Sequence, residues 1–375
     1  MNIGFDAKRA FHNHAGLGNY SRLIIQSFIS LYPEHYYHLF TPSATSRFQT
    51  KGKNVLIHSP SSFKNKILSS QWRRRNIIHD LEKNQIDIYH GLSNEIPARA
   101  YSHKIQSVVT IHDLIFEKYP NYYFWWDRKI YHHKSFQAAK EANRIIAISR
   151  QTKKDLIDYY GINPEKISVI YPIISSIFFS KSDEKQLIKA RNELNLPARY
   201  LLYVGTIEER KNLLTLVKAM HILKESVGLM LVVVGKPLTY KKEVVHYIEK
   251  NNLRHRVIFL EKVSNEILRN IYKLASAFIY PSFYEGFGMP VTEALACGVP
   301  VIASDIPVLH EAGGESPYYV DCSDEDQLAS VIVKVLEDEK LRTEMIEKGY
   351  RHASLFRYDL IAQQLMALYK QLLSM

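Results

Sequence analysis

The segment AFIYPSFYEGFGMPVTEALACGVPVIA, residues 277–303, holds two apolar runs separated by a glycine-rich loop and a helix-prone stretch. The runs at 277–280 and 301–303 predict buried strands, and Pro290 suits the first position of a helix that ends near Cys297. The same alternation of strands and helical stretches continues along the chain. Such alternation is typical of parallel sheets covered by helices, so the sequence predicts an α/β fold.

Two carboxylates bracket this loop, with Glu285 inside it and Glu293 in the first turn of the predicted helix. Gly286 and Gly288 let the backbone approach a ligand closely, while the free amides and the positive dipole end of the helix attract a phosphate. A nucleotide-sugar needs one anion site and carboxylates that bind hydroxyls, so the loop favours such a ligand. Taken singly, either glutamate is also explained as an ordinary acid at a helix start.

The order of these residues resembles one enzyme family. The Glu-x7-Glu pattern of residues 285–293, which encloses Gly-Phe-Gly-Met-Pro, and the following ALACGVPV resemble the retaining glycosyltransferases of family four. The resemblance covers nearly the whole chain and implies the GT-B fold, in which two doubly wound domains face each other across an active-site cleft. It implies that Glu285 contacts the transferred sugar, that Glu293 contacts the ribose hydroxyls, and that Gly286, Phe287 and Gly288 help to bind the donor.

The predicted strands fall into two series, which indicates two domains. The first series comprises 2–6, 37–40, 54–57, 86–89, 107–111 and 144–148, and the second comprises 200–204, 229–234, 257–260, 277–280 and 301–303. We expect an N-terminal acceptor-side domain, residues 1–175, and a C-terminal donor-binding domain, residues 176–357. The resemblance implies that the last helix, residues 358–375, packs back on the first domain.

A second motif, VGTIEERKN at residues 204–212, runs from a strand end into a helix start. In the resembling family a lysine at the place of Lys211 grips the donor diphosphate, with Arg210 beside it and Gly205 and Thr206 in the donor site. Two cations there neutralise the leaving group as the glycosidic bond breaks, although a solvated helix start is the alternative. Many relatives have arginine in place of Thr206. The threonine-bearing subgroup resembles mannosyltransferases of bacterial surface-polysaccharide assembly, which implies GDP-mannose as the donor.

The first domain carries further candidates. Gly16 and Gly18 match a glycine loop that faces the donor phosphates in the family, and a helix-entry turn is the alternative. His112 follows the predicted strand 107–111 and matches a histidine near the transferred sugar, which implies a substrate contact or a proton-handling role. A structural histidine is the alternative reading.

We expect catalysis without a metal. Asp324-Glu325-Asp326 fits the Asp-x-Asp pattern that holds a metal in the other major glycosyltransferase fold, but a helix follows directly, so these residues are interpreted as helix-start acids. No His/Cys cluster in the sequence has zinc spacing. Lys211, Arg210 and helix amides would then stabilise the departing diphosphate. No residue stands out as a covalent nucleophile, so same-face attack is expected, with the leaving phosphate taking the acceptor proton.

The net charge is confined to the first half of the chain. Residues 1–175 hold 24 Lys and Arg against 13 Asp and Glu, a net charge of +11, whereas the remaining residues balance at 25 and 25. The cluster of Trp72, Arg73, Arg74 and Arg75 predicts an acceptor-side contact with an anionic membrane surface, and aromatic residues at 122–126 accompany basic residues in the same half. A solvated basic face is the alternative.

The two cysteines give no disulfide framework, and no leader or apolar run of about 20 residues is present in this sequence. We expect a cytoplasmic enzyme that associates peripherally with the inner face of the cell membrane. It would transfer a hexose to a glycan or lipid-linked glycan. The alternatives are a nucleotide-sugar epimerase of the same fold and, from charge alone, a nucleic-acid-binding protein. No nucleic-acid-binding signature supports the latter, so we expect no nucleic-acid partner.

Overall fold

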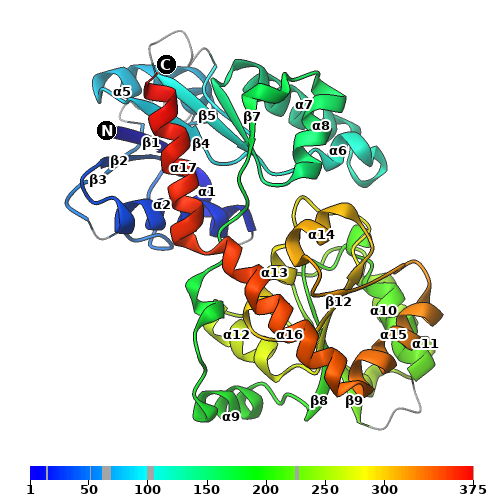
Figure 1. Ribbon diagram of the computed structural model, residues 1–375. Coiled ribbons are helices and arrows are strands. Elements are labelled where there is room, and N and C mark those ends of the chain that lie inside the picture. Colours follow the sequence, from blue (N-terminus) through cyan, green and yellow to red (C-terminus); the bar gives the residue numbers. More distant parts are fainter. Residues whose placement is uncertain (14–15, 51, 61–68, 99–104, 224–227, 375) are drawn as a thin grey trace. The chain divides into compact units, whose positions relative to one another are not determined.

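The computed structural model describes residues 1–375 apart from 14–15, 51, 61–68, 99–104, 224–227 and 375 (Figure 1). The chain forms two compact units, one of Met1–Ile173 with Tyr358–Met375 and the other of Ile174–Arg357. Each unit is built on a parallel sheet flanked by helices, which confirms the predicted α/β class. In the described parts of the chain, no helix combines the length and the apolar character that a membrane crossing requires.

The first unit has a seven-stranded parallel sheet in the order β3-β2-β1-β4-β5-β6-β7. Its strands are β1 (Asn2–Asp6), β2 (Tyr36–Phe40), β3 (Val55–His58), β4 (Ile88–Gly91), β5 (Gln106–Ile111), β6 (Arg144–Ala147) and β7 (Ile167–Val169). Its longer helices are α1 (Lys8–His12), α2 (Gly16–Leu31), α5 (Ile77–Lys83), α7 (Trp125–Glu141) and α8 (Arg150–Tyr160), with the short helices α4 (Ser69–Gln71) and α6 (Ile115–Lys118).

The strand order of this sheet reverses beside β1, which pairs with β2 on one side and with β4 on the other. The loops that follow β1 and β4 therefore diverge. In open α/β sheets, ligands bind at such a reversal, beyond the carboxyl ends of the strands. The first unit thus has a ready position for a ligand next to Asp6 and the residues after Gly91.

The C-terminal helix α17 (Tyr358–Leu373) belongs to this unit and lies beside α2 (Figure 1). Its residues Ile361, Leu365 and Tyr369 are buried in the same core as Phe28 of α2. The Tyr369 hydroxyl lies 2.5 Å from Nδ1 of His90 in β4. The end of the chain therefore completes the core of the N-terminal sheet.

The second unit has a six-stranded parallel sheet in the order β10-β9-β8-β11-β12-β13. Its strands are β8 (Arg199–Val204), β9 (Leu229–Val234), β10 (Val257–Leu260), β11 (Ala277–Tyr280), β12 (Val301–Ser304) and β13 (Tyr318–Val320). Its helices are α9 (Glu184–Glu193), α10 (Leu213–Ile222), α11 (Lys241–Lys250), α12 (Asn265–Leu274), α13 (Met289–Ala296), α14 (Pro307–Gly313), α15 (Glu325–Glu337) and α16 (Glu339–Ala353). Here the strand order reverses between β8 and β11, because β8 pairs with both β9 and β11.

Residues 277–303 form the predicted strand, loop, helix and strand, but Glu293 lies in the second turn of α13 and not in its first turn, as the sequence predicted, because the helix begins at Met289. All four residues of β11 are buried, as expected for a central parallel strand covered on both faces. Helix α13 begins one residue before the predicted start, and Gly288 caps it with φ +106°, a conformation that side chains rarely adopt. A Cβ at Gly288 would also lie 2.6 Å from Cδ2 of Leu309, so a side chain there would displace Leu309 as well as strain the backbone.

Another glycine, Gly235, brings the loops after β8 and β9 into contact. Its amide donates to the Leu260 carbonyl at 3.0 Å, and the Gly205 amide donates to the Val234 carbonyl at 2.9 Å. A Cβ at Gly235 would lie only 1.8 Å from the carbonyl oxygen of Gly205. The chain after β8 can therefore take its path only if position 235 has no side chain.

We predict that Gly235→Ala lowers the free energy of unfolding by about 1–3 kcal/mol, the usual cost of inserting a methyl group into a packed region. Thermal unfolding of the variant measures this loss. Gly16→Ala is the matched control, because a Cβ there meets no atom within 4 Å. Equal melting temperatures for wild type and Gly235→Ala would contradict the close approach of the two loops.

Candidate active site

The reversal point of the second sheet holds a cluster of charged side chains. Lys211 and Arg210 lie on the turn after β8, and Glu285 lies on the loop after β11. The Lys211 Nζ is 2.9 Å from Oε1 of Glu285, and Nη1 of Arg210 is 3.1 Å from Oε2. The Tyr280 hydroxyl donates to Oε1 at 2.8 Å and accepts from Lys211 at 3.0 Å. The structure thus joins three of the residues that the sequence singled out.

The Glu285 carboxylate stays ionised although it is buried. Burial alone would raise its pKa, but the charges of Lys211 and Arg210, with the hydrogen bonds from Lys211 and Tyr280, outweigh that effect and lower the pKa to about 2. A fixed negative charge therefore lies between two fixed positive charges at neutral pH. Such a site can stabilise both the negative and the positive charge that develop during a polar reaction.

Arg210 is held in place by more than one acceptor. Its guanidinium donates to the Tyr284 carbonyl at 2.8 Å and to the carboxylate of Glu208. Lys211 is buried too, and its Nζ lies 5.2 Å from the centre of the Tyr280 ring. Because both cations are oriented before any ligand arrives, little entropy is lost when they bind one.

Glu293 lies on α13 and has a different environment. The Tyr272 hydroxyl of α12 donates to its Oε2 at 3.2 Å. Burial of the carboxyl group raises its pKa to about 8, even though part of the residue reaches solvent. Glu293 is therefore mostly protonated at neutral pH, which the sequence did not predict. A neutral carboxyl can both donate and accept a hydrogen bond, so it suits sugar hydroxyls.

The residues between these two glutamates differ in what they offer a ligand. Gly286 is partly exposed, and Gly288 caps α13. Phe287 is buried, with its ring centre 5.3 Å from that of Phe356. The Phe287 ring therefore belongs to the core, and the expected role of this residue in donor binding stays a prediction.

On the turn after β8, Gly205 lies beside Lys211, and Thr206 follows Gly205 in the chain. A Cβ at Gly205 would meet Cδ of Lys211 at 3.1 Å, so the glycine leaves room for the lysine side chain. The Thr206 carbonyl accepts from the Tyr203 hydroxyl at 3.3 Å. Both residues thus shape the turn that carries the two cations.

Gly16 and Gly18 open helix α2 in the first unit. A Cβ at Gly18 would lie 2.1 Å from the Asn13 carbonyl oxygen, whereas one at Gly16 would meet nothing within 4 Å. Arg22 fixes the same turn by donating to the carbonyls of Ala10 and Asn13 at 2.8 and 2.9 Å. The close Asn13 carbonyl therefore explains why position 18 has no side chain. The donor role of both glycines stays a prediction.

His112 follows β5 and is a neutral imidazole. Its Nε2 lies 2.8 Å from the Leu92 carbonyl, and because a carbonyl only accepts, Nε2 carries the proton. Burial lowers its pKa to about 4 despite this hydrogen bond. Nδ1 is consequently an acceptor at neutral pH, so His112 can receive a hydrogen bond from a hydroxyl but is a weak base.

A cavity of about 370 Å³ lies beside His112, at the carboxyl ends of β4 and β5. Aromatic side chains line part of it, namely Phe116, Tyr123 and Tyr131, and polar groups line the rest, including Arg9, Asn94, Glu95, Asp113 and Lys134. Flat aromatic faces next to hydrogen-bonding groups are suited to a sugar ring, which has apolar faces and polar edges.

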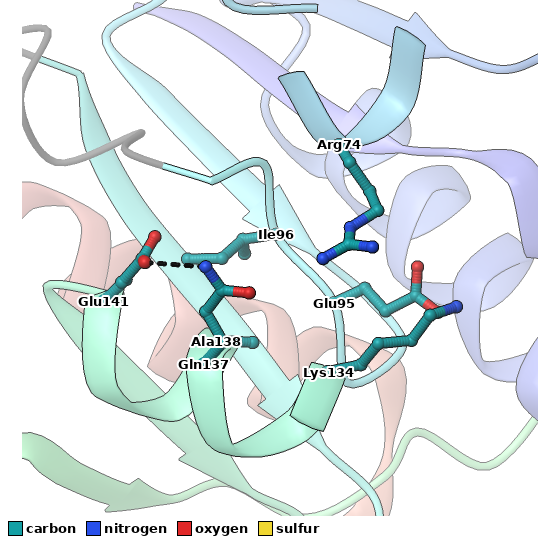
Figure 2. Close-up of a pocket in the computed structure, with 7 residues that line it drawn as sticks. All are labelled: Arg74, Glu95, Ile96, Lys134, Gln137, Ala138 and Glu141. Carbon is teal, nitrogen blue, oxygen red and sulfur yellow. Dashed lines mark hydrogen bonds and ion pairs between the residues drawn. The ribbon is translucent and has the colours of Figure 1, made fainter. Parts of the chain in front are cut away.

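The polar part of this cavity is anchored by Glu95. Lys134 donates to its carboxylate at 2.9 Å and Arg73 lies 3.3 Å from it. Burial opposes ionisation, yet these two cations lower the pKa of Glu95. Arg74, Glu95 and Lys134 all line a small adjoining cavity. Figure 2 shows the Arg74 side chain pointing towards Glu95.

Neither Glu95 nor Lys134 was identified from the sequence. One signal was available, since Glu95 comes four residues after the end of β4, at the point where the strand order reverses.

The expected membrane contact of Trp72 and Arg73 is wrong. Trp72 is 1% exposed, and its Nε1 donates to Asp80 at 2.7 Å. Arg73 is bound to the buried Asp6 carboxylate at 2.6 Å as well as to Glu95. Both side chains point into the first unit because they complete its core and neutralise Asp6. Arg74 and Arg75 are exposed, so their role stays a prediction.

The Asp324 side chain accepts from the amides of Asp326 and Gln327 at 2.9 and 3.0 Å. It caps α15, which confirms the helix-start interpretation of this acidic motif. Over the described ranges of the chain, no three His, Cys, Asp or Glu side chains are grouped as metal ligands.

Glu285 and Glu293 should affect stability in opposite ways as the pH changes. Glu285 has a pKa lowered from 4.5 to about 2, so its stabilising contribution is present above pH 4.5 and lost as the pH falls towards 2. The corresponding free energy is about 3 kcal/mol. Glu293 has a raised pKa, so its contribution is full below pH 4.5 and lost as the pH rises through 8.

We therefore predict that Glu285→Gln reduces the loss of stability in acid, while Glu293→Gln is more stable than wild type above pH 8. Urea unfolding over a pH series measures both effects. It is followed by circular dichroism and not by tryptophan fluorescence, because all three tryptophans lie in the other unit. If the free energy of unfolding falls equally in acid for wild type and Glu285→Gln, the ion-pair cluster is contradicted.

The chain is similar to known glycosyltransferases in sequence and in fold. A family model described as Glycosyltransferase Family 4 matches residues 16–176, and one described as Glycosyl transferases group 1 matches residues 184–352. The chain is similar to O-antigen chain mannosyltransferase B of Escherichia coli, with 29% identity over 76% of this chain and 74% of that protein. It is also similar to O-antigen chain mannosyltransferase RfbU of Salmonella typhimurium, with 31% identity over 60% of each chain, which is less than two thirds of that relative.

Among solved structures, HepE of Anabaena in complex with UDP-glucose has a TM-score of 0.77 and 17% identity, covering 99% of this chain and 100% of that one. The two family models span most of both units, and the fold is shared from end to end. The chain belongs to glycosyltransferase family four and has the GT-B fold.

Proposed function

We propose that this glycosyltransferase transfers mannose from GDP-mannose to a hydroxyl of a glycan or lipid-linked glycan, with retention of configuration. The observation that carries the proposal is the buried cluster of Lys211, Arg210 and Glu285. Two oriented cations suit a diphosphate leaving group, and an ionised carboxylate suits the electron-poor sugar. The choice of mannose is supported by the two relatives, both named as O-antigen chain mannosyltransferases.

In the proposed reaction, the bond between the anomeric carbon and the diphosphate oxygen breaks while the acceptor oxygen bonds to the same face of that carbon. The leaving phosphate takes the proton of the acceptor hydroxyl. Negative charge grows on the diphosphate as the bond breaks, and Lys211 and Arg210 stabilise it without a metal. Glu285 faces the developing positive charge of the sugar, and Glu293 binds the ribose hydroxyls as a neutral acid.

We assign the acceptor sugar to the cavity of the first unit. Its volume of about 370 Å³, its aromatic lining and the ion pair of Glu95 with Lys134 support this assignment. His112 lines the same cavity, and its Nδ1 can accept a hydrogen bond from a sugar hydroxyl. Arg74 stands next to Glu95 and extends the polar side of the site (Figure 2).

We also propose that the enzyme works as a peripheral protein at the inner face of the cell membrane, where a lipid-linked acceptor is held. The net charge of +11 in residues 1–175 supports an attraction to anionic lipid.

The donor proposal predicts that GDP and GDP-mannose raise the melting temperature of the protein, and that Lys211→Met removes both the shift and more than about 100-fold of the turnover. The measurement combines a thermal-shift screen of GDP, UDP, ADP and their sugars with a transfer assay run with and without EDTA. EDTA should leave the turnover unchanged.

Lys218→Met is the matched control, because Lys218 forms a half-exposed pair with Glu325 in the same unit. It should behave as wild type. Wild-type turnover in Lys211→Met, or no shift with any nucleotide, would contradict the donor site. A change of the donor sugar without an acceptor would favour an epimerase instead.

The acceptor proposal predicts that at least one of the methyl glycosides of mannose, glucose, galactose and N-acetylglucosamine binds the cavity. Saturation-transfer NMR should detect it in wild type and only weakly in Lys134→Met, since the lysine orients Glu95. Lys140→Met, which alters an exposed lysine of the same helix, should bind as wild type does. Equal signals in Lys134→Met and wild type would remove the acceptor from this cavity.

A further inference from the structure

The start of helix α7 exposes a group of large apolar side chains. Phe124 is 77% exposed, Trp125 54%, Trp126 58% and Ile130 50%. We call these four residues the α7 ridge. Single exposed apolar residues are common on protein surfaces, but a contiguous apolar group of this size marks an interaction surface.

The ridge is not needed to hold α7 in the fold. The helix is fixed by its second half, where Ser135, Ala138 and Ala139 are its buried residues. The first two turns contribute none. Burying a large apolar side chain stabilises a protein, so leaving half or more of each of these four side chains in water forgoes part of that gain. Some partner is expected to cover them.

The side chains of the ridge lie together. Trp126 and Ile130 are four residues apart and share one face of the helix, and the ring centres of Trp125 and Trp126 are 3.5 Å apart. A cluster of this kind fits either a protein groove or the interface of a bilayer, and the charges around it decide between the two.

Basic residues lie within the ridge. Arg128 and Lys129 are exposed, and Lys129 Nζ lies 4.8 Å from the centre of the Trp125 ring. Tryptophan at the interface with lysine and arginine at the headgroups is the arrangement by which proteins anchor to membrane surfaces. Asp127 is exposed beside them, but residues 1–175 as a whole carry +11, so an anionic surface is favoured.

We propose that the α7 ridge is the membrane-binding surface of this enzyme, with Phe124, Trp125, Trp126 and Ile130 in the interface of an anionic bilayer and Arg128 and Lys129 on its phosphates. It rests on the proposed function in one respect, since a lipid-linked acceptor gives the enzyme its reason to bind a bilayer. The surface replaces the contact that the sequence assigned to Trp72 and Arg73.

Helix α7 also connects the ridge to the cavity of the first unit. Lys134 and Ser135 line that cavity, and Lys134 follows Trp126 by eight residues, or roughly 12 Å along the helix axis. A sugar attached to a lipid headgroup would therefore reach the cavity while its lipid stays in the bilayer. One helix would both hold the membrane and present the acceptor.

The three tryptophans allow a direct test, because Trp72 is buried while Trp125 and Trp126 belong to the ridge. Vesicles of equal parts phosphatidylglycerol and phosphatidylcholine should shift the emission of the wild-type protein to the blue and protect it from acrylamide. Brominated lipid should quench it. Vesicles of phosphatidylcholine alone should bind about tenfold more weakly, and added salt should release the protein.

The double change Trp125→Ser with Trp126→Ser should weaken sedimentation with the anionic vesicles by about tenfold or more, and the remaining Trp72 emission should not respond to lipid. Arg128→Ser with Lys129→Ser should remove the salt-sensitive part of binding. Ile188→Ser with Ile222→Ser, which removes two exposed apolar residues of the other unit, is the matched control and should bind as wild type does.

The thermal shift with GDP is measured on the same variants and should be unchanged, which separates this surface from the donor site. Equal binding of wild type and the double tryptophan variant to anionic vesicles would overturn the proposal, whether or not GDP binds. So would a dimer in lipid-free solution that the double variant abolishes, because the ridge would then be covered by a second copy of the chain.

Discussion

The ion pair between Lys211 and Glu285 is the interaction on which the proposed donor site depends. Placing a carboxylate inside a protein costs several kcal/mol unless a cation accompanies it, and here two cations and a tyrosine hydroxyl do so. The strand order makes the arrangement possible. Because the sheet reverses between β8 and β11, the loops that carry Lys211 and Glu285 emerge side by side and leave space beyond the strand ends.

The first unit also has a network of ion pairs at the point where its strand order reverses. At its own reversal, Asp6 at the end of β1 binds Arg73, which also reaches Glu95, and Glu95 binds Lys134. Arg73 thus forms ion pairs with two acids, and Lys134 extends this network to the edge of the cavity. Each half of the proposed reaction is therefore supported by a charge network at the carboxyl ends of a parallel sheet.

Much of this could be predicted from the sequence, because the signals were local. The strand, loop and helix around Glu285, and the turn with Arg210 and Lys211, follow from apolar runs, glycines and a proline that act within a few residues. The short strand β13 was missed, since two of its three residues are only partly buried and give no apolar run. Trp72 was misassigned because it is buried and bonded to Asp80, and spacing does not reveal such a contact.

The protonation states and ion-pair partners of the charged side chains could not be predicted from the sequence. Arg73 and Arg74 have the same charge in the sequence, and only the fold turns one towards Asp6 and leaves the other exposed. The raised pKa of Glu293 likewise arises from burial beside α12, and the lowered pKa of Glu285 from a lysine 74 residues away. Local sequence determines where the residues of a site lie along the fold. Long-range contacts of this kind then determine their charge and their partners.

The most direct test of the account is a crystal structure of the protein with GDP bound. We expect the diphosphate to lie within hydrogen-bonding distance of Lys211 Nζ and the Arg210 guanidinium, with the ribose next to Glu293. A nucleotide bound elsewhere, or a diphosphate that touches neither Lys211 nor Arg210, would contradict it.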